Sequence, residues 1–460
     1  MLSSNAPPGN RFSISCSRYL TAIGRSSAVT ALIPTSSGIC FLPISQLSPG
    51  SKLARVRILV IGSGAREHAI VKSLIRTGTP AEDIVCAPGN EGIAGEVETR
   101  EVDQVDRLEV VKLALEERVD LVVIGPEAPL VAGVADALRE QGVAVFGPNK
   151  DAAQLEGSKN FAKEVMAAAD VPTGMAHQCT TMEEVENALD QFGAPFVVKA
   201  DGLAAGKGVI VTSDKSAALE HAGVYISGGV LVEEFLDGRE VSLFFLADGK
   251  SVMPLSPAQD YKRAFEGDEG PNTGGMGAYS PIPWLPEGFV EEVTERVAQP
   301  VINELARRGT EFVGLLYCGL IVTDRGLRVI EFNARFGDPE TQVVLRRLTS
   351  NLAELLMRAA TGKLDVGPSA EFSKRKAVTV VLASEGYPTS TADYREVVGI
   401  ESAESIEDVE VCKAGRVGRV LSVVGCGDSF QEARTLAYEG MSRISLQGGH
   451  YRNDIAARVS

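Results

Sequence analysis

Residues 196–209 read FVVKADGLAAGKGV, a β-branched run that ends near Lys199 and continues into a glycine-rich loop. The loop carries a second lysine, Lys207, and leads into another predicted strand at 208–212. Glycines let backbone N–H groups approach phosphate oxygens closely, and such a loop can close as a lid. An ordinary mobile hairpin is the alternative, but two lysines in so acidic a chain favour a phosphate ligand. The loop is not a Walker sequence, because G-x-x-x-x-G-K-[ST] is absent.

The second informative stretch lies downstream at 329–341 and reads VIEFNARFGDPET. On a strand, Glu331 and Asn333 project from the same face, while Phe332 points into the core. A carboxylate and a carboxamide oxygen side by side form a hard-oxygen site that suits Mg²⁺ with a triphosphate. If the strand continues, Arg335 shares this face and can stabilise a transferring phosphoryl group. The alternative is a half-buried strand with one polar side, which the density of polar residues disfavours.

The N-terminal part of the folded chain predicts a parallel sheet. The runs RILVIG at 57–62 and DLVVIG at 120–125 each precede an apolar-periodic helix, at 65–75 and 131–141, and a third short strand follows at 143–147. Strands that alternate with helices form βαβ units. Glycines at the carboxyl ends of these strands place the binding edge there.

The first glycine cluster resembles the start of a dinucleotide site, but the third glycine of G-x-G-x-x-G is replaced by Glu67. In a nicotinamide or flavin enzyme that glycine allows close packing over the pyrophosphate. A bulky acid therefore argues against an oxidoreductase. It favours a smaller phosphorylated ligand at the helix start, with Arg66 or Glu67 reaching its polar groups. A simple tight turn is the alternative.

The rest of the chain alternates in the same coarse way and ends in a mostly β segment. The predicted helices are 158–169, 182–192, 339–361 and 429–444, and the predicted strands are 173–178, 230–235, 240–246, 319–323, 327–333, 377–382 and 418–424.

Composition limits the classes of partner. Lys and Arg number 45 against 61 Asp and Glu, a net charge of −16, so no nucleic-acid partner is expected. Seven scattered cysteines and four histidines without ligand spacing argue against a zinc site or a disulfide framework.

The first fifty residues have a different composition. No acid precedes Glu67, and residues 1–50 hold eleven serines and three spaced arginines. This is typical of an organelle transit peptide, and the dominance of serine favours the chloroplast stroma over the mitochondrion, which stays open as a second destination. A disordered tail without function is the alternative. Three prolines between residues 34 and 49 argue against a membrane span, and no membrane partner is expected.

At this point the chain resembles a known family. The lysine loop, the Glu-x-Asn-x-Arg strand and VEEFL at 232–236 look like an ATP-grasp enzyme. More narrowly, the chain from Arg57 to Arg458 is similar to the phosphoribosylamine–glycine ligases of purine synthesis. The motifs that carry this resemblance are GSGAREHA at 62–69, APGN at 87–90, GPE at 125–127, LEGSK at 155–159, DYKR at 260–263, GPNTGGMGAYSP at 270–281 and FGDPETQ at 336–342.

The resemblance implies an α/β and α+β multidomain protein that ligates glycine to 5-phosphoribosylamine with ATP, through a glycyl phosphate. No protein nucleophile is needed, because ATP activates the acid. We expect a monomer with Mg²⁺ or Mn²⁺. Composition predicts a disordered transit peptide at 1–54. The resemblance implies an N-terminal parallel α/β substrate-binding domain at 55–155, an ATP-grasp domain at 156–372 with its lid at about 173–236, and a mainly β C-terminal domain at 373–460.

The resemblance also assigns site residues, position by position. Arg335 would be catalytic, and Glu331 and Asn333 would hold the metal. The ATP-binding residues would be Lys159, Lys199, Lys207, Glu233, Glu234, Phe235, Leu236 and Glu240. The residues for glycine and phosphoribosylamine would be Gly64, Glu67, Asn90, Glu127, Asp260, Asp338 and Glu340.

The chain departs from the family pattern at four places. Tyr261 replaces a usual histidine, and the segment before Val232 is several residues shorter. The stretch VCKAGRV at 411–417 replaces Phe-His-Ala-Gly-Thr and a longer hairpin, and a usual glycine is missing from DIAAR at 454–458. These departures motivate a competing hypothesis, an inactive relative that binds nucleotide without turnover. A wrongly predicted splice junction would leave the same signature.

Overall fold

The computed structural model describes residues 30–35, 38–43, 55–203, 208–390 and 393–460. The chain divides into two units, residues 1–55 and 56–460. In the first unit, β1 (Thr30–Thr35) pairs antiparallel with β2 (Gly38–Pro43). The rest of the predicted leader lies outside the described residues, and its role stays a prediction.

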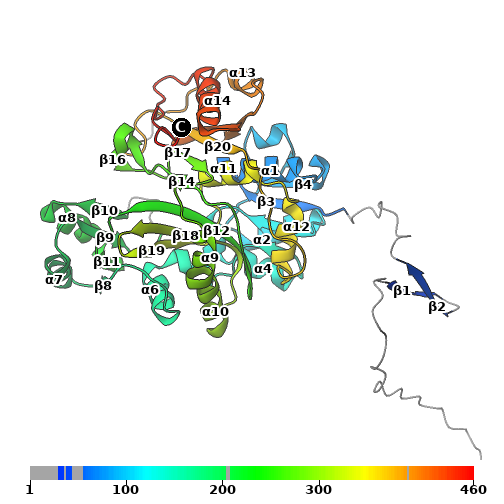
Figure 1. The fold of residues 1–460 in the computed structure, drawn as a ribbon, viewed down its shortest axis with the longest axis horizontal. Helices are drawn as coiled ribbons and strands as arrows, with labels where there is room; N and C mark the ends of the chain where they lie inside the picture. Colours follow the sequence, from blue (N-terminus) through cyan, green and yellow to red (C-terminus); the bar gives the residue numbers. More distant parts are fainter. Residues whose placement is uncertain (1–29, 36–37, 44–54, 204–207, 391–392) are drawn as a thin grey trace, which may run out of the picture. The chain divides into compact units, whose positions relative to one another are not determined.

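The second unit begins with the predicted parallel sheet, which has the strand order β5-β4-β3-β6-β7 (Figure 1). Every residue of β3 and β6 is buried, because helices cover both faces. One face packs against α1 and α12, and the other against α2 and α4. These elements are β3 (Ile58–Gly62), α1 (Ala65–Arg76), β4 (Ile84–Pro88), β5 (Glu98–Thr99), α2 (Arg107–Glu116), β6 (Leu121–Ile124), α4 (Val134–Glu140), β7 (Ala144–Phe146) and α12 (Leu352–Ala360).

A second sheet, which we call the lid sheet, carries the lysine loop. Its order is β10-β9-β11-β8, all antiparallel, and α7 and α8 cover one face (Figure 1). The shortened segment before Val232 completes α8, turns at Gly229 (φ 85°) and returns as β11 beside β9. The elements are β8 (Ala176–Cys179), α7 (Met182–Phe192), β9 (Phe196–Ala200), β10 (Val209–Thr212), α8 (Lys215–Tyr225) and β11 (Val230–Glu233).

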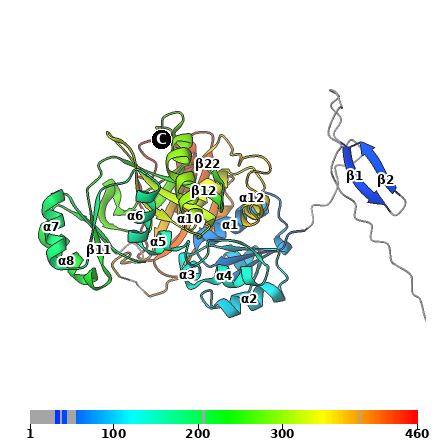
Figure 2. The same cartoon turned by 90° about the horizontal axis from the view of Figure 1, so that it is seen from below.

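A third sheet, the base sheet, has the order β13-β12-β18-β19 and is also antiparallel. Its two long central strands are almost entirely buried, since α10 packs on one face and α12 on the other; Figure 2 shows α6 beside α10. The elements are α6 (Lys159–Ala168), β12 (Arg239–Asp248), β13 (Val252–Pro254), α9 (Phe289–Val293), α10 (Gln299–Arg307), β18 (Val313–Thr323) and β19 (Gly326–Asn333).

The last sheet combines two parts of the chain. Its order is β14-β17-β20-β22-β21, so two strands from the segment counted with the ATP-grasp domain join the C-terminal strands, with β14 paired to β17 and β17 paired to β20. A short ribbon of β15 and β16 adjoins it. The elements are β14 (Gln259–Asp260), β15 (Arg263–Phe265), β16 (Glu269–Asn272), β17 (Gly277–Ser280), β20 (Lys376–Ala383), α13 (Ile400–Glu404), β21 (Val409–Lys413), β22 (Arg419–Gly427) and α14 (Phe430–Ser442).

Two of the departures from the family meet at this sheet. Tyr261 Oη accepts a hydrogen bond from Ala456 N (2.9 Å), and Ala456 adopts a left-handed φ of 58°. Ala456 belongs to the stretch 454–458, from which a usual glycine is missing, and left-handed backbone favours glycine. The tyrosine hydroxyl therefore secures the strained backbone at the C-terminal end of the chain.

Two predicted helices are wrong in extent. The helix expected at 339–361 is broken into α11 (Glu340–Arg347) and α12, because Leu348 is extended and Thr349 N donates to Glu371 O (2.9 Å). The helix expected at 131–141 is split into α3 (Glu127–Ala132) and α4 by Gly133, whose φ is 85°. Among the described residues, no helix combines the length and apolar character that a membrane crossing requires.

Candidate active site

A cavity of about 630 Å³ is lined by residues of the lid sheet, the base sheet and the N- and C-terminal parts of the unit. We call it the main cavity. Its walls bring together ten of the residues predicted from the sequence, which lie far apart along the chain. They are Glu127, Lys159, Lys199, Glu233, Asp260, Glu331, Asn333, Arg335, Asp338 and Glu340.

The two described lysines of the predicted ATP site reach the cavity from different elements. Lys199 is a buried residue of β9, and its Nζ lies 2.8 Å from Glu233 Oε2. Lys159 begins α6, and its Nζ donates to Gly202 O (3.1 Å). Burial lowers the pKa of Lys159 and outweighs the opposing effect of Glu331. Lys207 lies outside the described residues.

Glu331 and Asn333 alternate with the buried Phe332 on β19, as their spacing predicts, and both line the cavity. Gly319 lies opposite Glu331 across the strand pair, and a Cβ there would lie 3.1 Å from Glu331 Cγ. Burial alone would raise the pKa of Glu331, but nearby cations, Lys262 and Lys199 foremost, hold it below its ordinary value. An ionised carboxylate and an amide oxygen fit a hard divalent cation. Among the described residues, no group of three or more His, Cys, Asp or Glu is arranged to hold a metal.

Arg335 follows the end of β19 but still faces the cavity. Its Nη2 lies 3.0 Å from Glu156 Oε1, and its Nε donates to Glu127 Oε2 (3.3 Å). Glu156 Oε2 in turn accepts from Ala334 N (2.7 Å). Burial alone would lower the pKa of Arg335, but the two carboxylates raise it. The guanidinium is therefore a fixed, permanently charged group.

A buried polar cluster lies on the far wall, and the sequence analysis found only part of it. Tyr317 Oη donates to Glu340 Oε1 (2.6 Å), and Ser242 Oγ donates to the same oxygen (3.1 Å). Burial, opposed by Lys262 and reinforced by Glu340, raises the pKa of Asp260 to about 7. Nothing in the sequence marks Tyr317 and Ser242 except single hydroxyls in long apolar strands.

The other predicted ATP residues do not line the cavity. Glu234 N donates to Met175 O (3.0 Å), the Phe235 side chain is exposed, and Leu236 packs near Gly174. Glu240 is paired with Lys262. By contrast, Glu233 is buried at the end of β11 and lines the cavity.

The first glycine cluster forms a socket for Glu67. The carboxylate is buried and accepts hydrogen bonds from Gly64 N (2.6 Å) and Arg66 Nε (2.6 Å). A Cβ at Gly125 would lie 2.1 Å from Glu67 Oε1, so only glycine fits there. Glu67 and Gly64 do not line the main cavity, whereas Arg66 does and donates to Phe336 O (3.1 Å).

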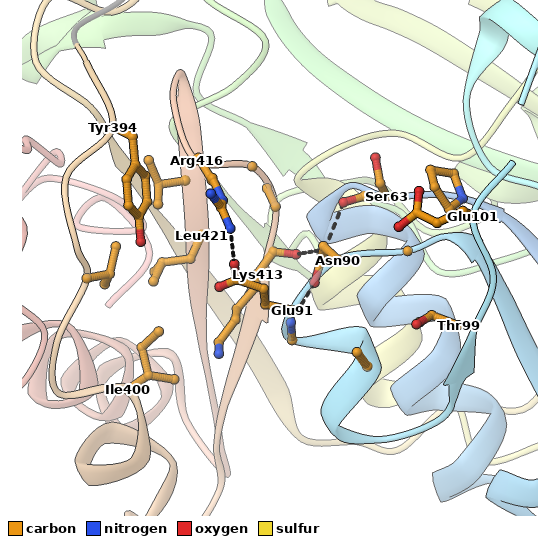
Figure 3. A pocket seen from close by; sticks show the side chains of 18 residues that line it. Ser63, Asn90, Glu91, Thr99, Glu101, Tyr394, Ile400, Lys413, Arg416 and Leu421 are labelled. Atoms are coloured by element: carbon orange, nitrogen blue, oxygen red, sulfur yellow. Dashed lines mark hydrogen bonds and ion pairs between the residues drawn. The ribbon is translucent and has the colours of Figure 1, made fainter. Parts of the chain in front are cut away.

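Asn90 lies in a second cavity of about 540 Å³ between the N-terminal turns and the C-terminal hairpin (Figure 3). Its amide donates to Ser63 O (2.7 Å) and Lys413 O (2.9 Å), and its oxygen accepts from Gly92 N and Ile93 N. Asn90 thus ties the two parts of the chain together.

Two cationic residues, Lys413 and Arg416, also line the second cavity. Arg416 pairs with Glu91 and lies over the Tyr394 ring at 4.9 Å (Figure 3). The Lys413 side chain lines the cavity without an ion-pair partner among the described residues.

Comparison with known proteins agrees with this geometry. Profiles of the phosphoribosylglycinamide synthetase N domain, ATP-grasp (A) domain and C domain match residues 56–156, 157–341 and 377–458. Phosphoribosylamine–glycine ligase of Leifsonia xyli subsp. xyli is 58% identical over 420 residues, which cover 88% of this chain and 100% of the relative. The Streptomyces coelicolor enzyme of the same name is 54% identical over 417 residues, with coverage of 88% and 100%.

A solved structure extends the likeness to the fold. The crystal structure of phosphoribosylamine–glycine ligase from Thermotoga maritima matches with a TM-score of 0.75 at 31% identity, covering 87% of this chain and 100% of that one. This chain therefore belongs to the phosphoribosylglycinamide synthetase family, and its central part is an ATP-grasp domain.

Proposed function

We propose that this chain ligates glycine to 5-phosphoribosylamine with ATP, giving glycinamide ribonucleotide, ADP and phosphate in purine (IMP) biosynthesis. The observation that carries the proposal is the convergence of Lys159, Lys199, Glu331 and Asn333 on one cavity. The competing hypothesis of an inactive relative rests on the shortened segments. After the first of these segments, which precedes Val232, β11 nevertheless pairs with β9, and Glu233 at the end of β11 lines the main cavity.

Two bond exchanges make up the reaction. A carboxylate oxygen of glycine attacks the γ-phosphorus, the bond from that phosphorus to the β-phosphate oxygen breaks, and ADP leaves. The amine nitrogen of phosphoribosylamine then attacks the carbonyl carbon of glycyl phosphate, phosphate leaves, and the nitrogen loses a proton to water. Lys159 and Lys199, joined by Lys207, neutralise the triphosphate. Arg335 is held in place to stabilise the charge that develops on the transferring group.

Glu331 and Asn333 would hold the divalent cation, for which we propose Mg²⁺ or Mn²⁺. When bound, such an ion screens the charge of the phosphates and polarises the transferring phosphoryl group. We also propose that the active form is a monomer, which sedimentation at assay concentration would test.

The ligase function is tested by phosphate release from protein beginning at about Ser51. We expect release from ATP only when glycine and freshly generated phosphoribosylamine are both present. Release with neither substrate, or ATP binding without release under any mixture, would contradict the proposal.

We propose that Asp260 and Glu340 hold the ammonium group of glycine. The folded-state pKa of Asp260, about 7, lies above its unfolded value of 3.8, so folding favours the protonated form and stability falls as the pH rises from about 4 to 7. Asp260→Asn removes this loss. The difference in Tm between Asp260→Asn and the parent should be roughly 2–4 °C more positive at pH 8 than at pH 5. The same variant should raise the KM for glycine about 10-fold or more. A Tm difference that is the same at both pH values would contradict the assignment.

The second cavity suits the phosphate of phosphoribosylamine. Ser63 lines it, and Arg66, three residues later in α1, lines the main cavity; we propose that phosphoribosylamine reaches from one cavity to the other. Lys413→Ala should raise the KM for phosphoribosylamine about 10–100-fold and leave the KM for ATP unchanged. The control is Lys374→Ala, which removes an exposed lysine that lies just before β20. An unchanged KM for phosphoribosylamine would contradict this placement.

We propose import into the chloroplast stroma, with the mitochondrion as a second destination. The proposal is supported by the acid-free, serine-rich composition of residues 1–54 and by the start of the family match at residue 56. A fluorescent protein fused behind residues 1–54 should accumulate in plastids, and a cytosolic signal would contradict it.

A further inference from the structure

Lys163 is a cavity residue to which the sequence analysis gave no role. It lies four residues after Lys159 on α6, so the two lysines share one face of the helix. Its Nζ donates to Thr173 Oγ1 (2.9 Å) and to Gly174 O (2.9 Å), and lies 3.4 Å from Glu233 Oε1. The Lys163 side chain is 16% exposed and that of Glu233 is 8% exposed.

These contacts distinguish Lys163 from a phosphate ligand. An ammonium group has three donors, and three protein acceptors occupy those of Lys163. Lys159 differs, since its Nζ has a single hydrogen-bond acceptor among the described residues, Gly202 O. Lys163 is therefore committed to the protein before any nucleotide arrives.

The contacts also join the cavity to the start of the lid. Thr173 Oγ1 donates to Val329 O (2.7 Å), and Val329 N donates to Pro172 O (2.8 Å), so residues 172–174 are anchored to β19 of the base sheet. Lys163 adds a link from this anchored segment to the last residue of β11.

We propose that Lys163 is a positioning residue that makes the site select adenine over guanine. It holds one oxygen of Glu233 while Lys199 holds the other, which fixes the orientation of the carboxylate. The inference rests on the proposed function and on the role that the family resemblance implies for Glu233, which is to accept a hydrogen bond from the adenine amine.

The chemistry of the two bases gives the selection. An ionised carboxylate only accepts hydrogen bonds. The 6-amino group of adenine donates one, whereas the 6-oxo group of guanine offers a second acceptor and is repelled. When Lys199 turns toward the phosphates, Lys163 is the cation that stays with Glu233. Without Lys163, the Glu233 carboxylate loses the contact that holds it in place, so it discriminates less well between an amino and an oxo group.

The test compares ATP and GTP binding in full-length protein without glycine or phosphoribosylamine. We expect the ratio of the two dissociation constants to favour ATP in the parent by about 100-fold or more, and Lys163→Met to reduce this preference about 10-fold, mainly by weakening ATP. Lys163→Arg should retain most of the preference. Lys215→Met, which also removes a lysine paired with two carboxylates, should leave the preference unchanged.

Glu233→Gln provides a second arm. It should lower the preference, and adding Lys163→Met to it should change the ratio less than about 2-fold, because coupled residues are not additive. If Lys163→Met weakens ATP and GTP by the same factor, or if Glu233→Gln leaves the ratio unchanged, the proposal is overturned. Since the readout is nucleotide binding alone, a parent that binds ATP but lacks turnover would defeat the ligase function and not this inference.

Discussion

Replacing Glu331 with alanine should lower turnover by about 10³-fold. The carboxylate is the only acidic member of the predicted metal pair on β19, and Lys262, Lys199 and other cations surround it. Its removal would take away the anionic ligand of the divalent ion and leave those cations without a counter-charge. Steady-state phosphate release at saturating substrates measures the effect.

The control for this variant is Asp324→Ala, which removes an exposed carboxylate from the turn between β18 and β19. It should have parental turnover. Glu331→Gln keeps the shape and an oxygen ligand, and should be impaired less than the alanine variant, with partial recovery at high metal concentration. Near-parental turnover of Glu331→Ala would remove Glu331 from the metal site.

Lys199→Ala should lower kcat/KM by about 10²–10³-fold and also destabilise the free protein. The Lys199 and Glu233 side chains are 7% and 8% exposed. Breaking such a buried pair from one side costs about 3–5 kcal/mol, because the remaining charge is left in a poorly solvated place. Denaturant unfolding without nucleotide and initial rates with ATP measure the two effects.

Adding Glu233→Gln to Lys199→Ala separates the two causes. The double variant should recover part of the lost stability, because no charged carboxylate oxygen is then left without its Lys199 partner, but none of the lost activity. Lys215→Ala on α8 of the same lid sheet removes a surface ion pair and should change stability by at most about 1 kcal/mol. Recovery of turnover in the double variant would show that Lys199 acts through Glu233 and not on the phosphates.

Local patterns predicted those parts of the site that depend on one strand or one helix. The spacing of Glu331 and Asn333 predicted a shared face, and the structure has both beside the cavity. The same reasoning applied to α6 would have found Lys163, since it follows Lys159 by four residues. Helix ends were less predictable, because the break at Leu348 depends on a contact with Glu371, which lies in another segment.

At the first glycine cluster, local sequence patterns did not predict which polar side chain reaches the cavity. The sequence predicted that either Arg66 or its neighbour Glu67 contacts a ligand. In the structure, Glu67 fills the glycine socket and only Arg66 lines the main cavity. Asn90 and Glu127 both follow strands of the parallel sheet, but they line different cavities. Which of two adjacent polar groups is buried depends on the packing of the strands around them.

The order of motifs along this chain was enough to indicate the fold class, the lysine loop and the acid–amide pair, because side-chain alternation on a strand is a property of the backbone itself. Only the tertiary structure joined β17 to β20, brought Tyr317 and Ser242 to Glu340, and tied Lys163 to Glu233. A buried polar group must find a partner, and that partner is supplied by whichever distant segment packs against it, which no local spacing specifies.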